Sequence, residues 1–146
     1  MDNPGLLSSV HLLYLASHNL RLLIDEKVKE YELGFNSWMV LVFIRNEPAL
    51  LTQREIAARL GLKEPSVGEL IKQLMKRKYL ARAVDVRDRR KYAIKITAPG
   101  VATYDAVQQV LMPVLGDVFN ALDLSHLQKA LTTILLTTKE YIAEGE

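Results

Sequence analysis

The chain of 146 residues contains no cysteine. Disulfide bonds, thiolate metal sites, a cysteine nucleophile and cysteine-based redox sensing are therefore excluded. Long apolar runs are also scarce: the first segment, MDNPGLLSSVHLLYLASHNL, is acidic rather than basic, and polar residues interrupt its apolar part. This segment resembles neither a signal peptide nor a membrane span. We therefore expect a cytoplasmic protein with no membrane partner.

The sequence also lacks the combinations of residues on which enzymes depend. No nucleophile is paired with a suitably placed base, and there is no glycine-rich phosphate loop. His11 and His18 are seven residues apart on one expected helical face. Two imidazoles without nearby carboxylate or thiolate ligands are weak evidence for a metal site. We therefore expect neither an enzyme nor a bound metal or cofactor.

Positive charge is concentrated in one part of the chain. From Lys72 to Lys95, ten basic residues are opposed only by Asp85 and Asp88, which leaves a formal charge of +8. The remainder holds 9 basic and 15 acidic residues, a formal charge of −6. Such a block indicates a localised site for a polyanion such as nucleic acid, with a solvated basic surface as the alternative.

Two short helices in the middle of the chain form the pattern of a helix-turn-helix. In LTQREIAARLGL, Thr52 and Glu55 have the spacing of a capping box, and Gly61 supplies a left-handed exit. Pro65 suits the first position of the next helix, whose apolar residues from Val67 onward repeat at helical spacing. The outward positions of this helix are Ser66, Gly68, Glu69, Lys72, Gln73 and Lys76. Gly68 lies in the interior of this helix, where glycine is unfavourable. Either DNA approaches the backbone closely at this position, or the helix simply tolerates the glycine.

The next segments, YLARAV and KYAIKIT, alternate apolar and polar residues and predict two β-strands. Between them, DVRDRR forms the tip of a basic hairpin. A basic hairpin directly after a helix-turn-helix is a wing.

Leucine-rich helices are expected on both sides of this central segment. Residues 6–33 and the segment from Ala98 onward repeat apolar residues at three- and four-residue steps. Pro113 should kink the second of these helices, and Asp123 or Ser125 can cap a final one. Because these helices hold more leucine and valine than one small domain needs, we expect them to pair with a second copy. Packing onto their own domain is the alternative.

Together these elements predict a mostly α protein, a six-helix winged helix-turn-helix with a two-stranded wing. Residues 35–99 are expected to form a DNA-binding lobe, and residues 1–34 and 100–146 a helical dimerisation region. Gly34 should end the first helix, and Asn36 or Ser37 should cap the second, which runs through WMVLVFIRNE.

The run from Leu51 to Gly100 resembles the core of the MarR family of bacterial transcriptional regulators. The residues that match its D-x-R-D-x-R wing and L-T-x-x-G strand end are Asp85, Arg87, Asp88, Arg90, Ile96, Thr97 and Gly100. The resemblance implies a homodimer whose two winged lobes bind a near-palindromic operator in double-stranded DNA, usually to repress. It also implies release by a small aromatic or phenolic effector. Tyr79 stands where the family often has a glycine closing the recognition helix, so we expect a different helix exit.

The residues expected to contact DNA come from three elements. A helix N-terminus at Thr52 favours phosphate, and the outward positions of the second helix can meet base edges in the major groove. By resemblance, Arg90 of the wing enters the minor groove, with Asp88 orienting an arginine. The expected set is Thr52, Gln53, Arg54, Pro65, Ser66, Gly68, Glu69, Lys72, Gln73, Lys76, Arg87, Asp88, Arg89, Arg90 and Lys91.

An effector pocket is expected near the junction of the helices, lined by His11, His18, Trp38, Met39 and Arg82. For Trp38 and Met39, burial in the core without any role in binding is the alternative. Arg82 can instead pair with Asp85. Two other functions stay open. One is a DNA-binding regulator without an effector, and the other is a winged-helix scaffold that binds proteins.

Overall fold

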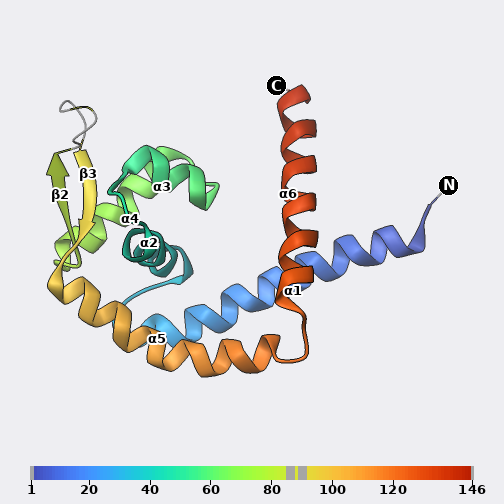
Figure 1. Cartoon of the computed structure of the whole chain (residues 1–146), viewed down its shortest axis with the longest axis horizontal. Helices are drawn as coiled ribbons and strands as arrows, with labels where there is room; N and C mark the ends of the chain where they lie inside the picture. Colours follow the sequence, from blue (N-terminus) through green and yellow to red (C-terminus); the bar gives the residue numbers. More distant parts are fainter. Residues whose placement is uncertain (1, 85–87, 89–91, 146) are drawn as a thin grey trace. The chain divides into compact units, whose positions relative to one another are not determined.

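The computed structural model describes residues 2–84, 88 and 92–145, and its described part contains six α-helices and three strands (Figure 1). In chain order these are α1 (Pro4–Val28), α2 (Phe35–Asn46), β1 (Leu51–Thr52), α3 (Gln53–Leu60), α4 (Glu64–Lys76), β2 (Leu80–Val84), β3 (Tyr92–Ile96), α5 (Ala98–Phe119) and α6 (Leu124–Gly145). The predicted mostly α winged helix-turn-helix is confirmed. The chain forms two compact units, Met1–Leu111 and Met112–Glu146, and the boundary falls within α5.

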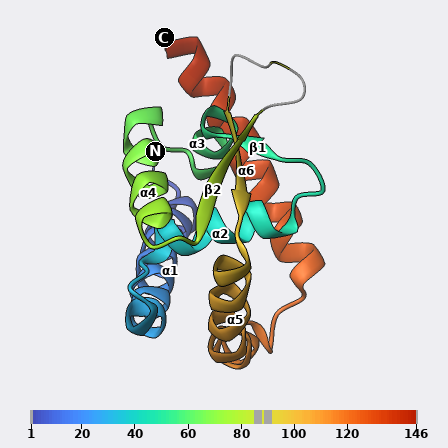
Figure 2. The same ribbon diagram turned by 90° about the vertical axis from the view of Figure 1, so that its left-hand side faces the viewer.

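The first unit is built around a small antiparallel sheet with the strand order β1-β3-β2. The predicted wing strands pair from Leu80 opposite Ile96 to Val84 opposite Tyr92, and Figure 2 shows them beside α4. The third strand was not predicted. Only Leu51 and Thr52 belong to it, and two residues are too few to display the alternation that marks a strand.

The apolar stripes of the helices close over this sheet to form the core. Ile56 of α3, Val67 and Leu74 of α4, and Leu41 of α2 are almost completely buried. Val107 in the first half of α5 is buried as well. The predicted inward stripe of α4 is therefore confirmed, although its Leu70 is only half-buried.

The turn between α1 and α2 differs from the prediction. α1 ends at Val28, a 3₁₀ turn η1 (Lys29–Tyr31) follows, and Glu32 has a left-handed backbone with φ 59° and ψ 34°. Gly34 does not end the first helix but is the N-cap of α2. Asn36 and Ser37, the predicted caps, instead lie inside that helix, where the Ser37 hydroxyl accepts a hydrogen bond from the Gly34 N–H at 2.8 Å.

The cause of this difference is a contact from α1. The carboxylate of Asp25 accepts a hydrogen bond from the Phe35 N–H at 2.6 Å. An amide in the first turn of α2 is thus satisfied by a residue ten positions earlier, so no capping residue is needed at the usual local position.

The exit of α4 is closed without a glycine. Lys78, rather than Tyr79, has the left-handed backbone, with φ 67°. The Lys78 N–H donates to the Met75 carbonyl and the Tyr79 N–H to the Leu74 carbonyl, both at 2.9 Å. This is the hydrogen-bond pattern of a Schellman motif, so Tyr79 itself needs no left-handed conformation.

The start of α5 is fixed against this exit. The Thr97 hydroxyl donates to the Lys78 carbonyl at 2.6 Å, and the Thr97 N–H donates to the Tyr79 carbonyl at 3.0 Å. The same hydroxyl accepts from the Gly100 N–H at 3.1 Å. A Cβ placed on Gly100 would lie 2.2 Å from the Tyr79 carbonyl oxygen. A side chain at this position is therefore incompatible with the observed packing.

The second unit contains the end of α5, which includes Pro113, and all of α6. Asp123 caps α6, accepting a hydrogen bond from the His126 N–H at 3.2 Å, as one of the two predicted alternatives stated. Within the chain, α6 buries none of its described residues. An apolar groove of about 540 Å³ lies in this unit. Its lining is formed by Met112, Leu115, Gly116, Phe119, Leu124, Leu127, Gln128 and Leu131.

Over the described ranges, no single helix is both long and apolar enough to cross a membrane; α5 and α6 meet that test only when taken together as a bent pair.

Candidate nucleic-acid interface

The N-terminus of α3 is organised by the predicted capping box. The Thr52 hydroxyl accepts a hydrogen bond from the Glu55 N–H at 3.2 Å, and the Glu55 carboxylate accepts from the Thr52 N–H at 3.1 Å. Thr52 is only 9% exposed, and its hydroxyl also donates to the Glu55 carboxylate. The N–H and the hydroxyl of Thr52 are thus engaged within the chain, while Arg54 in the first turn of α3 is exposed.

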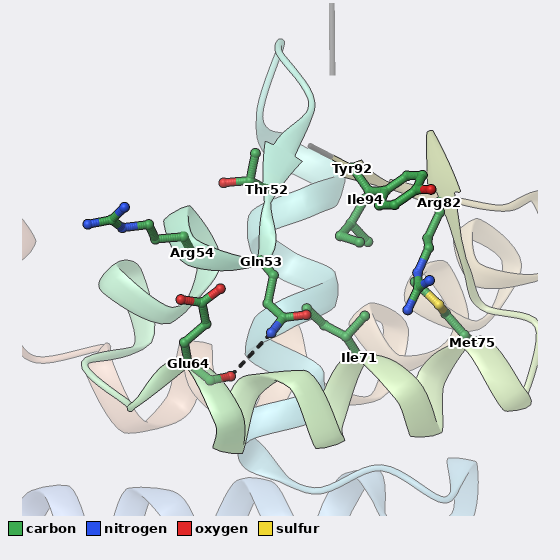
Figure 3. Close-up of a pocket in the computed structure, with 9 residues that line it drawn as sticks. All are labelled: Thr52, Gln53, Arg54, Glu64, Ile71, Met75, Arg82, Tyr92 and Ile94. Carbon is green, nitrogen blue, oxygen red and sulfur yellow. Dashed lines mark hydrogen bonds between the residues drawn. The ribbon is translucent and has the colours of Figure 1, made fainter. Parts of the chain in front are cut away.

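Gly68 of α4 faces α3 and is half-buried rather than fully outward. A Cβ on Gly68 would lie 2.9 Å from Nε2 of Gln53. The Gln53 amide passes this glycine and donates to the Glu64 carbonyl at 3.4 Å (Figure 3). The prediction that Gly68 points outward is therefore wrong, because its missing side chain makes room for a residue of the neighbouring helix.

The remaining outward positions of α4 lie where the sequence predicted. Its inward residues Val67, Ile71 and Leu74 are buried against the core. The side chains on the opposite face are exposed, and these are Pro65, Ser66, Glu69, Lys72, Gln73 and Lys76. One surface of α4 therefore offers hydroxyl, carboxylate, amide and ammonium groups to an external partner.

A groove of about 410 Å³ lies between the N-terminus of α3, the side of α4 and the wing strands (Figure 3). Arg82 reaches from β2 toward Met75 of α4, and its guanidinium carbon is 5.5 Å from the centroid of the Tyr92 ring. The groove is lined by Thr52, Gln53, Arg54, Glu64, Ile71, Met75, Arg82, Tyr92 and Ile94. The N-terminus of α3, α4 and the wing strands thus border one concave surface, to which none of the exposed outward residues of α4 contributes.

The predicted wing-tip contacts Arg87, Arg89, Arg90 and Lys91 lie outside the described residues, as does Asp85. Asp88 is described and half-buried. The strands that lead to the tip are present as predicted, so the roles of the tip residues stay predictions.

The five residues expected to line an effector pocket are dispersed. His11 and His18 are exposed on α1, where His18 stacks on Tyr14 with ring centroids 6.1 Å apart. Trp38 is buried and Met39 half-buried on α2. The fifth residue, the arginine of β2, lines the groove described above, to which none of the other four contributes.

A polar network between α2 and α5 was not predicted. The Trp38 indole N–H donates to the Gln108 side-chain oxygen at 3.3 Å, and the Gln108 amide donates to the Tyr104 hydroxyl at 3.2 Å. The Asn46 amide donates to the same hydroxyl at 3.0 Å. Because the first and last of these bonds join residues 70 and 58 positions apart, no local sequence pattern could have shown them.

The comparisons with known proteins agree with this geometry. Residues 31–91 match the model of the MarR family, a segment that runs from the end of η1 to the tip of the wing. MepR of S. aureus, solved in complex with DNA, is 22% identical, with a TM-score of 0.78 over 88% of this chain and 95% of that chain. CouR from Rhodococcus jostii RHA1, solved bound to p-coumaroyl-CoA, is 23% identical, with a TM-score of 0.76 over 84% and 86%.

The transcriptional regulator BldR from Sulfolobus solfataricus is 17% identical, with a TM-score of 0.81 over 94% of this chain and 99% of that chain. These likenesses show that the fold is shared along almost the whole chain. The match to the family model adds sequence evidence at the helix-turn-helix and the wing. By the family model over residues 31–91 and by its fold, the chain is similar to the MarR family of transcriptional regulators.

Proposed function

We propose that the protein is a homodimeric, cytoplasmic regulator that binds a near-palindromic operator in double-stranded DNA and represses transcription. We further propose that a small aromatic or phenolic effector releases it. The observation that carries the proposal is the exposed polar face of α4, a helix that also borders one groove together with the N-terminus of α3 and the wing strands. MepR with bound DNA and CouR with bound p-coumaroyl-CoA are relatives of the same fold that support each half of it.

The recognition step follows from the side chains on α4. The width of an α-helix suits the major groove of DNA. There the Gln73 amide can pair with adenine, and the Glu69 carboxylate can accept a hydrogen bond from cytosine. Lys72 can reach guanine, and Lys76 at the last turn can neutralise a phosphate. The first turn of α3 presents Arg54 and the positive end of the helix dipole to a second phosphate. Phosphate contacts would set the position of the helix, and base contacts would supply the sequence preference.

The proposed dimer follows from the state of α6. A helix of 22 residues that buries none of its described side chains gains little from its own chain, and helices in water depend on packing of an apolar face. Apolar residues of α6 that are exposed in the single chain are Leu124, Leu131, Ile134, Leu135, Leu136, Tyr141 and Ile142. The N-terminal half of α1 likewise exposes Leu6, Leu7, Val10 and Leu13. A second copy covers these surfaces by closed two-fold symmetry.

Replacing Arg90 by alanine should weaken operator binding and lower its dependence on salt. If Arg90 inserts into the minor groove, its loss removes one displaced counterion, so the slope of log affinity against log salt should fall by about one. Fluorescence anisotropy measures both, on a duplex that the wild-type protein selects from a randomised pool. Lys129→Ala, a charge removed from α6, is the control and should change neither. Equal affinity and slope in Arg90→Ala would remove the wing from the mechanism.

An effector should reveal itself by reciprocal coupling. In a thermal-shift screen of hydroxybenzoic and hydroxycinnamic acids, an effector raises the melting temperature of the free protein, because it binds the folded state. It should also lower DNA affinity, and the selected duplex should lower effector affinity by the same factor. A screen in which no acid changes either the melting temperature or DNA affinity would favour a regulator without an effector of this class.

A further inference from the structure

Arg77, at the end of the recognition helix, links two residues that have a strained backbone conformation. Among the described residues, Glu32 and Lys78 are the non-glycine residues with positive φ. This conformation is unfavourable for a residue with a Cβ, and it persists only where surrounding contacts enforce it, often at functional positions. Glu32 lies in the turn after α1, and Lys78 directly follows α4 and its C-cap residue Arg77. Glu32 and Lys78 are 46 positions apart in the sequence, yet Arg77 contacts Glu32 and is joined to Lys78 by the peptide bond.

The contact between Arg77 and Glu32 has two points. The Nη1 group of Arg77 donates to the backbone carbonyl of Glu32. Its Nε lies 3.3 Å from the Glu32 carboxylate. The Arg77 side chain is 35% exposed, and its guanidinium is directed to the turn after α1. Arg77 belongs to the basic block of the sequence, but its charge is committed within the chain.

The exit of α4 is held from its other side as well. The carbonyl of Lys78 accepts from the Thr97 hydroxyl, and the carbonyl of Tyr79 accepts from the Thr97 N–H. Residues 77–79 therefore connect the recognition helix to the end of α1 and to the start of α5. These are the two helices of the first unit that lead toward the surfaces assigned above to the dimer.

We infer that Arg77 is a positioning residue, which fixes the C-terminal end of α4 against the turn after α1 and so sets how the recognition helix is presented to DNA. It does so without binding a phosphate itself. The inference rests on the proposed DNA-binding function. Its neighbour Lys76 is exposed and can reach a phosphate in the same proposal, so substitutions of the two adjacent cations should differ in their effect on the scrambled duplex and on the salt slope.

The test compares Arg77→Gln and Arg77→Lys with Lys76→Gln and Lys76→Arg. Each variant is titrated against two duplexes, one selected by the wild-type protein from a randomised pool and one with the same bases scrambled. Both Arg77 variants should bind the selected duplex about three- to tenfold more weakly, because lysine lacks the planar fork that makes the two-point contact. Affinity for the scrambled duplex, and its salt slope, should stay at the wild-type value, since phosphate contacts are intact.

The Lys76 variants should behave as a phosphate contact requires. Lys76→Gln should weaken binding to both duplexes and lower the salt slope by about one, and Lys76→Arg should restore both. If Arg77→Lys binds the selected duplex as well as wild type does, or if Arg77→Gln lowers the salt slope by about one, Arg77 is a phosphate contact and the inference is wrong. A variant that had merely lost fold stability would melt earlier and bind both duplexes more weakly by the same factor, which also contradicts it.

Hydrogen exchange of the free protein separates this inference from the proposed function. Arg77→Gln removes the contact with Glu32, so the amides of Lys78 and Tyr79 should exchange faster in this variant. In Lys76→Gln they should exchange at the wild-type rate. Unchanged exchange in Arg77→Gln would contradict the inference that Arg77 fixes the end of α4, whatever the protein binds. A wild-type protein that selects no sequence and binds no duplex in a salt-dependent way would overturn the DNA-binding proposal, even if the amides respond.

Discussion

Glutamate in place of Leu135 should turn the proposed dimer into a monomer. Leu135 is 53% exposed in the single chain, so its substitution costs the isolated chain little. In a dimer that covers α6, the change removes about 1.5–3 kcal/mol of apolar burial and adds a carboxylate whose desolvation costs several kcal/mol. The dissociation constant should rise at least about a hundredfold. Sedimentation equilibrium over a range of concentrations measures it.

Thr133→Glu is the matched control for this prediction. Leu131 and Leu135 are four residues apart and share one face of α6, whereas Thr133 projects from the opposite face. Its hydroxyl donates only to the carbonyl of Lys129 in its own helix. Thr133→Glu should leave the dimer intact. A Leu135→Glu protein that still sediments as a dimer would show that this face of α6 lies outside the interface.

Gly100→Ala should be strongly destabilising. The new Cβ would lie 2.2 Å from the Tyr79 carbonyl oxygen and 2.7 Å from Cγ1 of Ile96. The oxygen cannot retreat freely, because it accepts the hydrogen bond from the Thr97 N–H. We expect a loss of about 2–4 kcal/mol in the free energy of unfolding and a fall of roughly 5–15 °C in melting temperature. Urea and thermal unfolding, followed by circular dichroism, measure these losses.

Gly116→Ala provides the control in the same helix. A Cβ at Gly116 meets no atom within 4 Å, so the substitution should stabilise the helix by about 0.5–1 kcal/mol. The opposite signs of the two changes isolate the contact with Tyr79 from the general preference of helices for alanine. Equal stability of Gly100→Ala and wild type would mean that the junction between α4 and α5 yields without cost.

The features predicted correctly from the sequence are those set by near neighbours. The Thr52–Glu55 capping box and the left-handed Gly61 depend on residues within one helical turn, and both are confirmed. The buried and exposed faces of α4 follow from the helical period, which Val67 and Lys72 display on opposite sides. Local signals of this kind need no knowledge of the tertiary structure.

The features that were missed depend on distant partners. Gly34 became a helix cap because Asp25 supplies a hydrogen bond from α1, and β1 forms only because β3 pairs with it. The helical period of α4 predicts that Gly68 points outward, but the side chain of Gln53 occupies the space next to it. Each of these outcomes requires the packing of two elements, which a one-dimensional pattern does not contain.

The candidate site shows the same division. Apart from Gly68, the residues of α4 predicted to point outward are exposed, because they share one helix and one period. The expected effector residues were chosen by residue type from three separate elements, and the structure places Trp38 in the core and Arg82 in the groove beside α4. Arg77 was grouped with the basic residues by composition alone, and its inward contact with Glu32 has no counterpart in charge counting.

The lack of buried side chains among the described residues of α6 in the single chain has a consequence for the abundance of the protein in the cell. If a second copy covers α6, as proposed above, the stability of this helix depends on protomer concentration. Below the dissociation constant of the proposed dimer, the helix would open more often and become a substrate for proteases. Turnover would then remove protomers that have found no partner. The intact molecules that persist would then be mostly dimers.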